Sequence, residues 1–473
     1  MEFNLMSTDT VYPNINIVFD DSLYAVSDDT VFVCSVGQRF NSKITFPSYA
    51  DSIRIGGSPI SYNQPLVIPN NVTNVSYLFN YCRSFNCPVT LNSGITNCAF
   101  MFSRANNFNA PVTANEGITT LAQLFETSVN TESIFNQPMN IPESVTNCAR
   151  MFFNCSNFNQ PINIPDNVYD YNAMFSYCSN FNSPINIAKQ NTQIVSDATN
   201  MFYGCYNFNQ PVNVPDNTII YCLFYGCNNF NQPFNIPNNT TTLYQTFRGC
   251  LNFNQPINVP NAVVNMVQAF WGCFNLDSKI TFENNTPTND VFIRTFEGCY
   301  SFNKNVVFPN GTNRLEATFC NCTTFNASVV IPPTTNNTYQ MYWNVNSCQY
   351  NFANSKFNTT PSYQALRSPI YFFANNIAVG GAQQMFSGCN TVSELYIIGI
   401  TNNYQLNMFL RNNGINRCNI YTDDASLELL RTTPMLVGGT KPTWTSDTAN
   451  GCIYNTTANI YIYNNWDGTL PTI

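Results

Sequence analysis

The sequence predicts a right-handed solenoid of about sixteen coils, each of about 23 residues, with a parallel sheet along one face. The first observation is a recurring segment: FNQPINIP at 158–165 returns as FNSPINIA at 181–188, FNQPVNVP at 208–215 and FNQPINVP at 253–260. The second is the spacing, because successive Phe-Asn pairs lie 22 or 23 residues apart, with occasional intervals of 26 or 27. A sustained period of this length is typical of stacked coils that contact only their neighbours.

The first element of each coil is a short strand after the Phe-Asn pair. Ile162 and Ile164 flank Asn163, and the same alternation recurs in the other coils. A period of two places the apolar side chains on the inner face and the central residue outside. Pro161 and Pro165 bracket the segment. We therefore expect strands of about three or four residues, since proline cannot donate to a sheet.

The second element is the return segment of the coil. Its apolar residues are spaced three or four apart with one adjacent pair: Val145, Cys148, Met151, Phe152 and Cys155. This spacing predicts a helical turn or an irregular helical segment packed behind the strand.

Five regions follow from where the repeat is regular. We expect an N-terminal cap or attachment segment at 1–38, the regular solenoid at 39–331 and an irregular insertion at 332–365. Degenerate repeats at 366–421 precede a C-terminal cap at 422–473, in which Asp423–Arg431 reads as a short capped helix.

Composition excludes several classes of function. Only 9% of the residues are charged, the net charge is -8 and no histidine is present. Without a basic stripe we expect no nucleic-acid binding, and without histidine no imidazole-dependent catalysis or zinc site. No secretory signal or membrane-length apolar run is visible, so we expect no membrane insertion, and synthesis in a cytoplasm or export by another route. We expect no enzyme activity and no cofactor.

Cysteine recurs once per coil, three residues before the Phe. A small apolar side chain suits this stacked position, and a buried thiol behaves as one. We predict a reduced structural ladder, with disulfides among scattered residues such as Cys98 or Cys148 as the alternative. The ladder includes Cys155, Cys178, Cys205, Cys227, Cys250 and Cys273.

Two sets of asparagines recur at fixed positions. The Asn of the Phe-Asn pair is expected to satisfy backbone groups at the bend and to bond the amide of the next coil. The outward residue of the strand forms a second row, called here the outer Asn row, which is either a binding face for a glycan or protein loop or a ladder of mutually bonded amides. The outer Asn row comprises Asn140, Asn163, Asn186, Asn213, Asn235 and Asn258.

The repeat unit, for example MFYGCYNFNQPVNVPDN at 201–217, resembles the BspA-like class of leucine-rich repeats, strongly over 40–331 and weakly over 366–421. This resemblance implies a right-handed solenoid with a parallel sheet, often in surface or adhesion proteins. Asn-rich versions with few charges also resemble bacteriophage proteins.

From this second resemblance we expect a bacteriophage virion structural protein, such as a fibre, decoration or tail-associated component, that supports host attachment. Its partners would be other virion proteins and a host surface glycan or protein receptor, and homo-oligomerisation stays open. The alternatives are a bacterial cell-surface adhesin and a purely structural virion assembly protein.

Overall fold

The computed structural model divides into two compact units, 1–232 and 233–473, which are considered separately. It describes residues 62–128, 131–187, 194–283, 290–309 and 311–325, together with shorter stretches. The shorter stretches are 17–18, 30–32, 44–45, 52–54, 327, 329–330, 337–338, 341, 370–373, 394–398, 418–432, 443, 445–448, 452–455 and 460–464.

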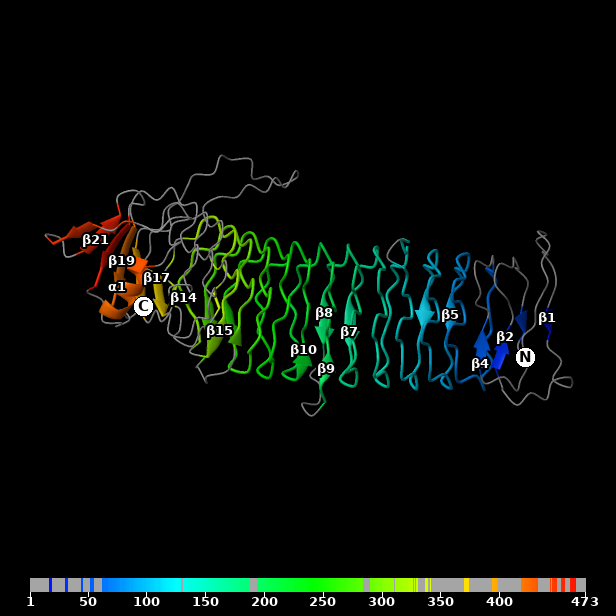
Figure 1. The fold of residues 1–473 in the computed structure, drawn as a ribbon. Coiled ribbons are helices and arrows are strands. Elements are labelled where there is room, and N and C mark those ends of the chain that lie inside the picture. Colours follow the sequence, from blue (N-terminus) through cyan, green and yellow to red (C-terminus); the bar gives the residue numbers. More distant parts are fainter. Residues whose placement is uncertain are drawn as a thin grey trace. The chain divides into compact units, whose positions relative to one another are not determined.

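The first unit is a stack of parallel coils whose strands pair from one coil to the next (Figure 1). One row follows the Phe-Asn pairs, and a second row of strands and single bridges lies on the return side of the coils. The strands are β1 (Ile17–Val18), β2 (Thr30–Phe32), β3 (Ile44–Thr45), β4 (Ser52–Arg54), β5 (Val89–Thr90), β6 (Val112–Thr113), β7 (Ile162–Ile164), β8 (Ile185–Ile187), β9 (Ser196–Asp197) and β10 (Thr218–Ile219).

The second unit is built from the same kind of coil and ends in a longer sheet. Its eight-stranded sheet has the order β14-β16-β17-β18-β19-β22-β21-β20 and is parallel except at β20 and β21. The strands are β11 (Ile257–Val259), β12 (Ile280–Phe282), β13 (Asp290–Val291), β14 (Val306–Val307), β15 (Thr312–Arg314), β16 (Val329–Val330), β17 (Ile370–Phe373), β18 (Glu394–Ile398), β19 (Cys418–Thr422), β20 (Thr445–Asp447), β21 (Cys452–Asn455) and β22 (Ile460–Tyr463).

One helix, α1 (Asp424–Thr432), is present in the described part of the chain, one residue from its predicted start. The side chain of Asp423 caps it by accepting from the amide of Ser426 at 2.7 Å. No helix among the described residues is long and apolar enough to span a membrane.

The core of the first unit is a double column of phenylalanine rings. Phe152 and Phe158 stack within one coil with centroids 4.0 Å apart, and Phe158 stacks on Phe181 of the next coil at 5.9 Å. These rings are fully buried, as are the other apolar residues predicted for the return segment of this coil. Each ring therefore packs both within its coil and across the stack, which explains why a lone coil lacks a core.

The return segment differs from the predicted helical form, because it is a run of consecutive turns. The amide of Cys155 donates to Phe152 in its own coil at 2.9 Å, whereas the amides of Phe152 and Asn154 donate to Met174 and Ser176 of the next coil at 2.9 and 2.8 Å. Asn154 has a left-handed φ of 59°. Left-handed residues at regular intervals turn alternate amides toward the neighbouring coil, whereas a helix would keep all of them inside its own coil.

The asparagine of the Phe-Asn pair forms the expected ladder. The Oδ1 atom of Asn136 accepts from the amide of Asn159 at 2.9 Å, and the Oδ1 atom of Asn159 accepts from the amide of Asn182 at 2.8 Å. In the second unit Asp277 takes the same place and accepts from Asn303 at 2.9 Å. The predicted role of this asparagine is confirmed.

The solenoid class is confirmed, but the described residues show fewer turns than the sixteen expected. The described coils carry buried anchors from Tyr62 to Phe325. Most of 39–61 and most of the degenerate repeats expected at 366–421 lie outside the described residues. Most of the segments assigned to 1–38 and 332–365 lie outside them too, so the five-region division stays a prediction.

Candidate binding surface

The outer Asn row lies on the solvent side of the first strand row. Asn163 of β7 pairs directly with Asn186 of β8, and both side chains are exposed, whereas Ile162 and Ile164 beside Asn163 are 2% and 1% exposed. Asn258 holds the equivalent place in β11, and Asn140, Asn213 and Asn235 are exposed in coils without an assigned strand there. The alternation of burial explains this placement, because successive strand residues point to opposite faces.

The amides of this row do not form a mutually bonded ladder in the first unit. Within the described residues, the side chains of Asn163 and Asn186 donate and accept no protein hydrogen bond, and the same holds for Asn140 and Asn213, and for Asn235 of the second unit. Water satisfies exposed amides as well as a neighbouring amide does, so no energy forces them to pair. Each side chain therefore offers one acceptor and two donor hydrogens to a ligand.

Asn258 in the second unit is different because both the oxygen and the nitrogen of its side-chain amide have protein partners. Thr281 of the next coil donates to its Oδ1 atom at 3.0 Å, and its Nδ2 atom donates to Glu283 at 2.5 Å. This end of the row is therefore preorganised by neighbouring side chains, unlike the rest of it.

The glutamines next to the Phe-Asn pairs serve the anchor ladder. Gln160 donates to Asn136 Oδ1 at 3.1 Å, and Gln210 donates to Asn182 Oδ1 at 3.3 Å. These glutamines are therefore bonded to the anchor asparagines at the edge of the exposed face. The side chains of the outer Asn row that lack protein partners are the polar groups of this face that remain available to a ligand.

The ladder cysteines lie in the core and bond to the backbone of the preceding coil. The thiol of Cys178 donates to the Phe152 carbonyl at 3.0 Å, and that of Cys205 donates to Phe175 at 3.0 Å. Cys155, Cys227 and Cys273 make the same contact, to Phe125, Phe202 and Phe247. Cys250 is buried at the equivalent position. Burial raises the pKa of the Cys155 thiol to about 12.

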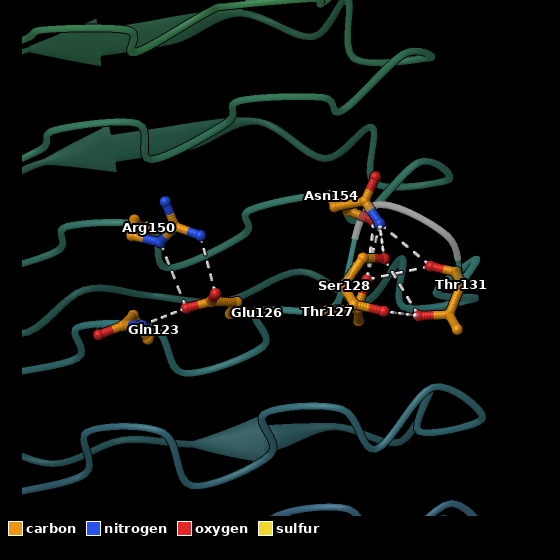
Figure 2. Close-up of polar contacts among 7 residues, drawn as sticks. All are labelled: Gln123, Glu126, Thr127, Ser128, Thr131, Arg150 and Asn154. Carbon is orange, nitrogen blue, oxygen red and sulfur yellow. Dashed lines mark hydrogen bonds and ion pairs between the residues drawn. The ribbon is translucent and has the colours of Figure 1, made fainter.

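Sequence reasoning missed a polar cluster at the start of a longer coil (Figure 2). The Nδ2 atom of Asn154 donates to Thr127 Oγ1 at 3.0 Å, to the Ser128 carbonyl at 2.5 Å and to the Thr131 carbonyl at 3.1 Å. Asn154 is 9% exposed. Its side-chain amide holds Thr127, Ser128 and Thr131 in place where this coil is longer than the 23-residue repeat. The cluster is therefore structural. The 27-residue interval was the available signal.

An ion pair flanks this cluster on the same return segment. Arg150 contacts Glu126 at 2.8 Å (Figure 2). Its guanidinium also lies 3.7 Å from the ring centroid of Phe153. Gln123 donates to the same carboxylate. Both charges are matched, so this site offers no unpaired group for chemistry.

Half-buried aromatic rings form a second feature that the sequence reasoning passed over. Tyr203 stacks on Tyr225 with centroids 4.3 Å apart and lies 5.2 Å from Tyr177. Burial, together with the neighbouring tyrosines, raises the pKa of Tyr203. The recurring YGC and WGC triplets were the signal. In the part of the chain that the structure describes, no three His, Cys, Asp or Glu residues are grouped to hold a metal.

The fold and this exposed row define a leucine-rich-repeat-like solenoid with one polar face of repeated amides. The chain belongs to the family described as "Mycoplasma protein of unknown function, DUF285", whose model matches residues 68–162, 119–236, 213–308 and 241–363. No curated protein matches the chain.

A solved structure, that of a leucine-rich cell surface protein from Faecalibacterium prausnitzii, is similar at 17% sequence identity. The match covers 71% of this chain and 87% of that chain, with a TM-score of 0.32. A bacteriophage origin, which the second resemblance implied, is not supported by these comparisons.

Proposed function

We propose that this chain is a non-enzymatic recognition protein of a cell surface, whose outer Asn row binds a neutral polar ligand such as a glycan or a protein loop. The observation that supports it is that the side chains of Asn163 and Asn186 are exposed, lie in register and make no hydrogen bond to a described residue. Repeated amides at about 4.8 Å intervals suit a ligand with repeated hydroxyl or peptide groups.

The location at a cell surface rests on the resemblance of the repeat to BspA-like proteins. The virion role is the less supported alternative, because it rests on the second resemblance alone. It would use the same face, and finding the chain in purified particles but not on intact cells would favour it over a surface adhesin.

The absence of catalysis is part of the proposal. The sequence has no histidine. The neighbouring carboxylates Asp170 and Asp197 serve as turn acceptors for the amides of Asn172 and Thr199 at 3.2 and 2.8 Å. Asn147 does the same for Ala149 at 2.9 Å, so these acids fill a structural position that asparagine also fills.

The test compares two asparagine pairs in neighbouring coils. Asn163→Ala with Asn186→Ala removes two amides of the outer row. The control pair, Asn180→Ala with Asn207→Ala, removes exposed amides that bond each other at 3.3 Å. Both proteins, and the unchanged full chain, are titrated onto intact host cells and onto a glycan and matrix-protein array.

We expect the outer-row variant to lose at least tenfold in affinity and the control to bind as the unchanged chain does. Equal binding by all three proteins would show that this face is not the contact surface. Circular dichroism and thermal melting check that both variants keep the fold.

A further inference from the structure

The second unit contains an open hollow of about 510 Å³ on the face of the outer Asn row. Its apolar part comes from Phe234, Ile257 and Pro256, and its polar part includes Asn235 and Asn258 of the row. Phe234 and Ile257 are 5% and 1% exposed, so the apolar floor is fixed by the core. Apolar surface beside amide groups suits a sugar ring, which has C–H faces and hydroxyl edges.

The polar groups in the hollow are held in different ways. Asn258 is fixed between Thr281 and Glu283, at 3.0 and 2.5 Å, so these three side chains have set positions. Asn235 is exposed and makes no side-chain hydrogen bond to a described residue. A ligand hydroxyl can therefore meet a fixed carboxylate at one end of the hollow and an adaptable amide at the other.

Lys279 adds a positive charge in a chain in which charges are scarce. It lines the hollow, its side chain is exposed, and it forms no ion pair with a described residue. Its backbone is fixed, because its carbonyl accepts from the amide of Ile257 at 3.1 Å. Lys304 of the same unit is different, since it contacts Asp277 at 2.9 Å.

The balance of charge selects among anionic ligands. Glu283 lines the same hollow, so the site as a whole carries one positive and one negative group. A single ammonium beside a carboxylate disfavours a dianion such as a phosphate monoester, which usually needs several donors or a guanidinium fork. A single carboxylate on a sugar can contact Lys279 while its hydroxyls contact Glu283 and the amides.

We propose that this hollow binds a saccharide that carries a carboxylate, with Lys279 pairing with the acid group and Asn235, Asn258 and Glu283 contacting hydroxyls. The inference rests on the proposed function, since it names the ligand class of the same face. It also predicts that the acidic sugar binds at one place in the second unit, whereas neutral contacts extend along the row.

The test uses the full chain and two matched probe pairs in calorimetry: sialyllactose against lactose, and oligogalacturonate against galacto-oligosaccharide. The variants are Lys279→Ala and Lys279→Glu, with Lys304→Ala as a control outside the hollow. We expect one acidic probe to bind at least tenfold more tightly than its neutral partner. Lys279→Ala should remove that preference, Lys279→Glu should weaken acidic binding further, and Lys304→Ala should change neither.

The outcomes separate this inference from the proposed function. Equal affinity for acidic and neutral probes, or an acidic preference that survives Lys279→Ala, overturns the inference. If no saccharide binds but the Asn163 and Asn186 pair is needed for attachment to a protein ligand, the inference fails and the proposed function stands. If that pair is not needed for any surface binding, the proposed function fails as well.

Discussion

The backbone amide of Asn182 donates to the side-chain Oδ1 atom of Asn159 in the preceding coil at 2.8 Å. The hydroxyl of Ser183 contacts the same oxygen at 3.0 Å. One acceptor thus satisfies two donors of the next coil at its sharpest bend. Repeated along the stack, this contact fixes the register of the strands that carry the outer Asn row.

Replacing Asn159 by alanine should lower the free energy of unfolding by about 1 kcal/mol, because the amide of Asn182 loses its acceptor. Asn159→Asp should be close to neutral, since Asp277 serves the same purpose for Asn303 at 2.9 Å. Urea unfolding of the two variants measures the difference. Equal loss in both would show that the donor hydrogens of Asn159, and not its oxygen, matter.

The opposite pattern is expected at Asn154, where the side chain acts as a donor to three oxygens. Both Asn154→Ala and Asn154→Asp should destabilise, by about 1–3 kcal/mol, because buried acceptors are left unpaired and aspartate adds repulsion. The measurement is the melting temperature of the two Asn154 variants, compared with that of Asn159→Ala and Asn159→Asp. A tolerated Asn154→Asp would contradict the donor role shown in Figure 2.

Asp170 gives a prediction about pH. Burial, opposed by a hydrogen bond from Asn172 and reinforced by Asp197, raises the pKa of its carboxyl above the ordinary value of an aspartate. A raised pKa in the folded state means that the folded state binds the proton more tightly, so stability is lost as pH rises through the folded pKa. At neutral pH the ionised Asp170 therefore destabilises the stack.

Asp170→Asn should accordingly raise the melting temperature at pH 7, with a gain below about 1 kcal/mol because the group is half exposed and solvent screens it. The turn acceptor is kept, as in the natural Asn147. The gain should vanish when pH falls below about 3.9, where the carboxyl is protonated in both states. Asp166→Asn, an exposed substitution in the preceding turn, is the control, and an equal gain there would contradict the explanation.

The ladder cysteines should resist alkylation in the folded protein. Burial raises the pKa of the Cys155 thiol to about 12 and that of the Cys178 thiol well above its usual value, so almost no thiolate exists at pH 8. Cys87 is half exposed and should react before the ladder cysteines. Timed alkylation followed by peptide mass spectrometry measures the order. Labelling of Cys178 as fast as Cys87, or its recovery in a disulfide, would contradict the reduced ladder.

The stacked packing was predictable because each coil repeats the same pattern of apolar residues. Phe158 and Phe181 mark the period, and their fixed spacing requires stacking. The alternation of Ile162, Asn163 and Ile164 likewise placed the amide outside, since strand geometry admits two faces. The role of Asn159 as a hydrogen-bond acceptor was predictable because the backbone amides at a sharp bend need a partner.

The return segment was not predictable from apolar spacing alone. Val145, Cys148 and Met151 recur at intervals that fit a helix and a run of turns equally well. The choice depends on where the amides find acceptors, and the amide of Phe152 finds the Met174 carbonyl of another coil. Contacts between coils decide this, and they exist only once the stack has formed.

The sequence by itself determined the repeat, the buried phenylalanine columns and the exposed position of the outer Asn row, because periodicity fixes which side of a coil each residue occupies. Only the tertiary structure decided that the side chains of Asn163 and Asn186 do not bond each other. It also decided that Asn258 is held by Thr281 and Glu283, and that Lys279 lines the same hollow as these three residues. These features depend on side-chain directions and on distances between coils, which a one-dimensional pattern does not contain.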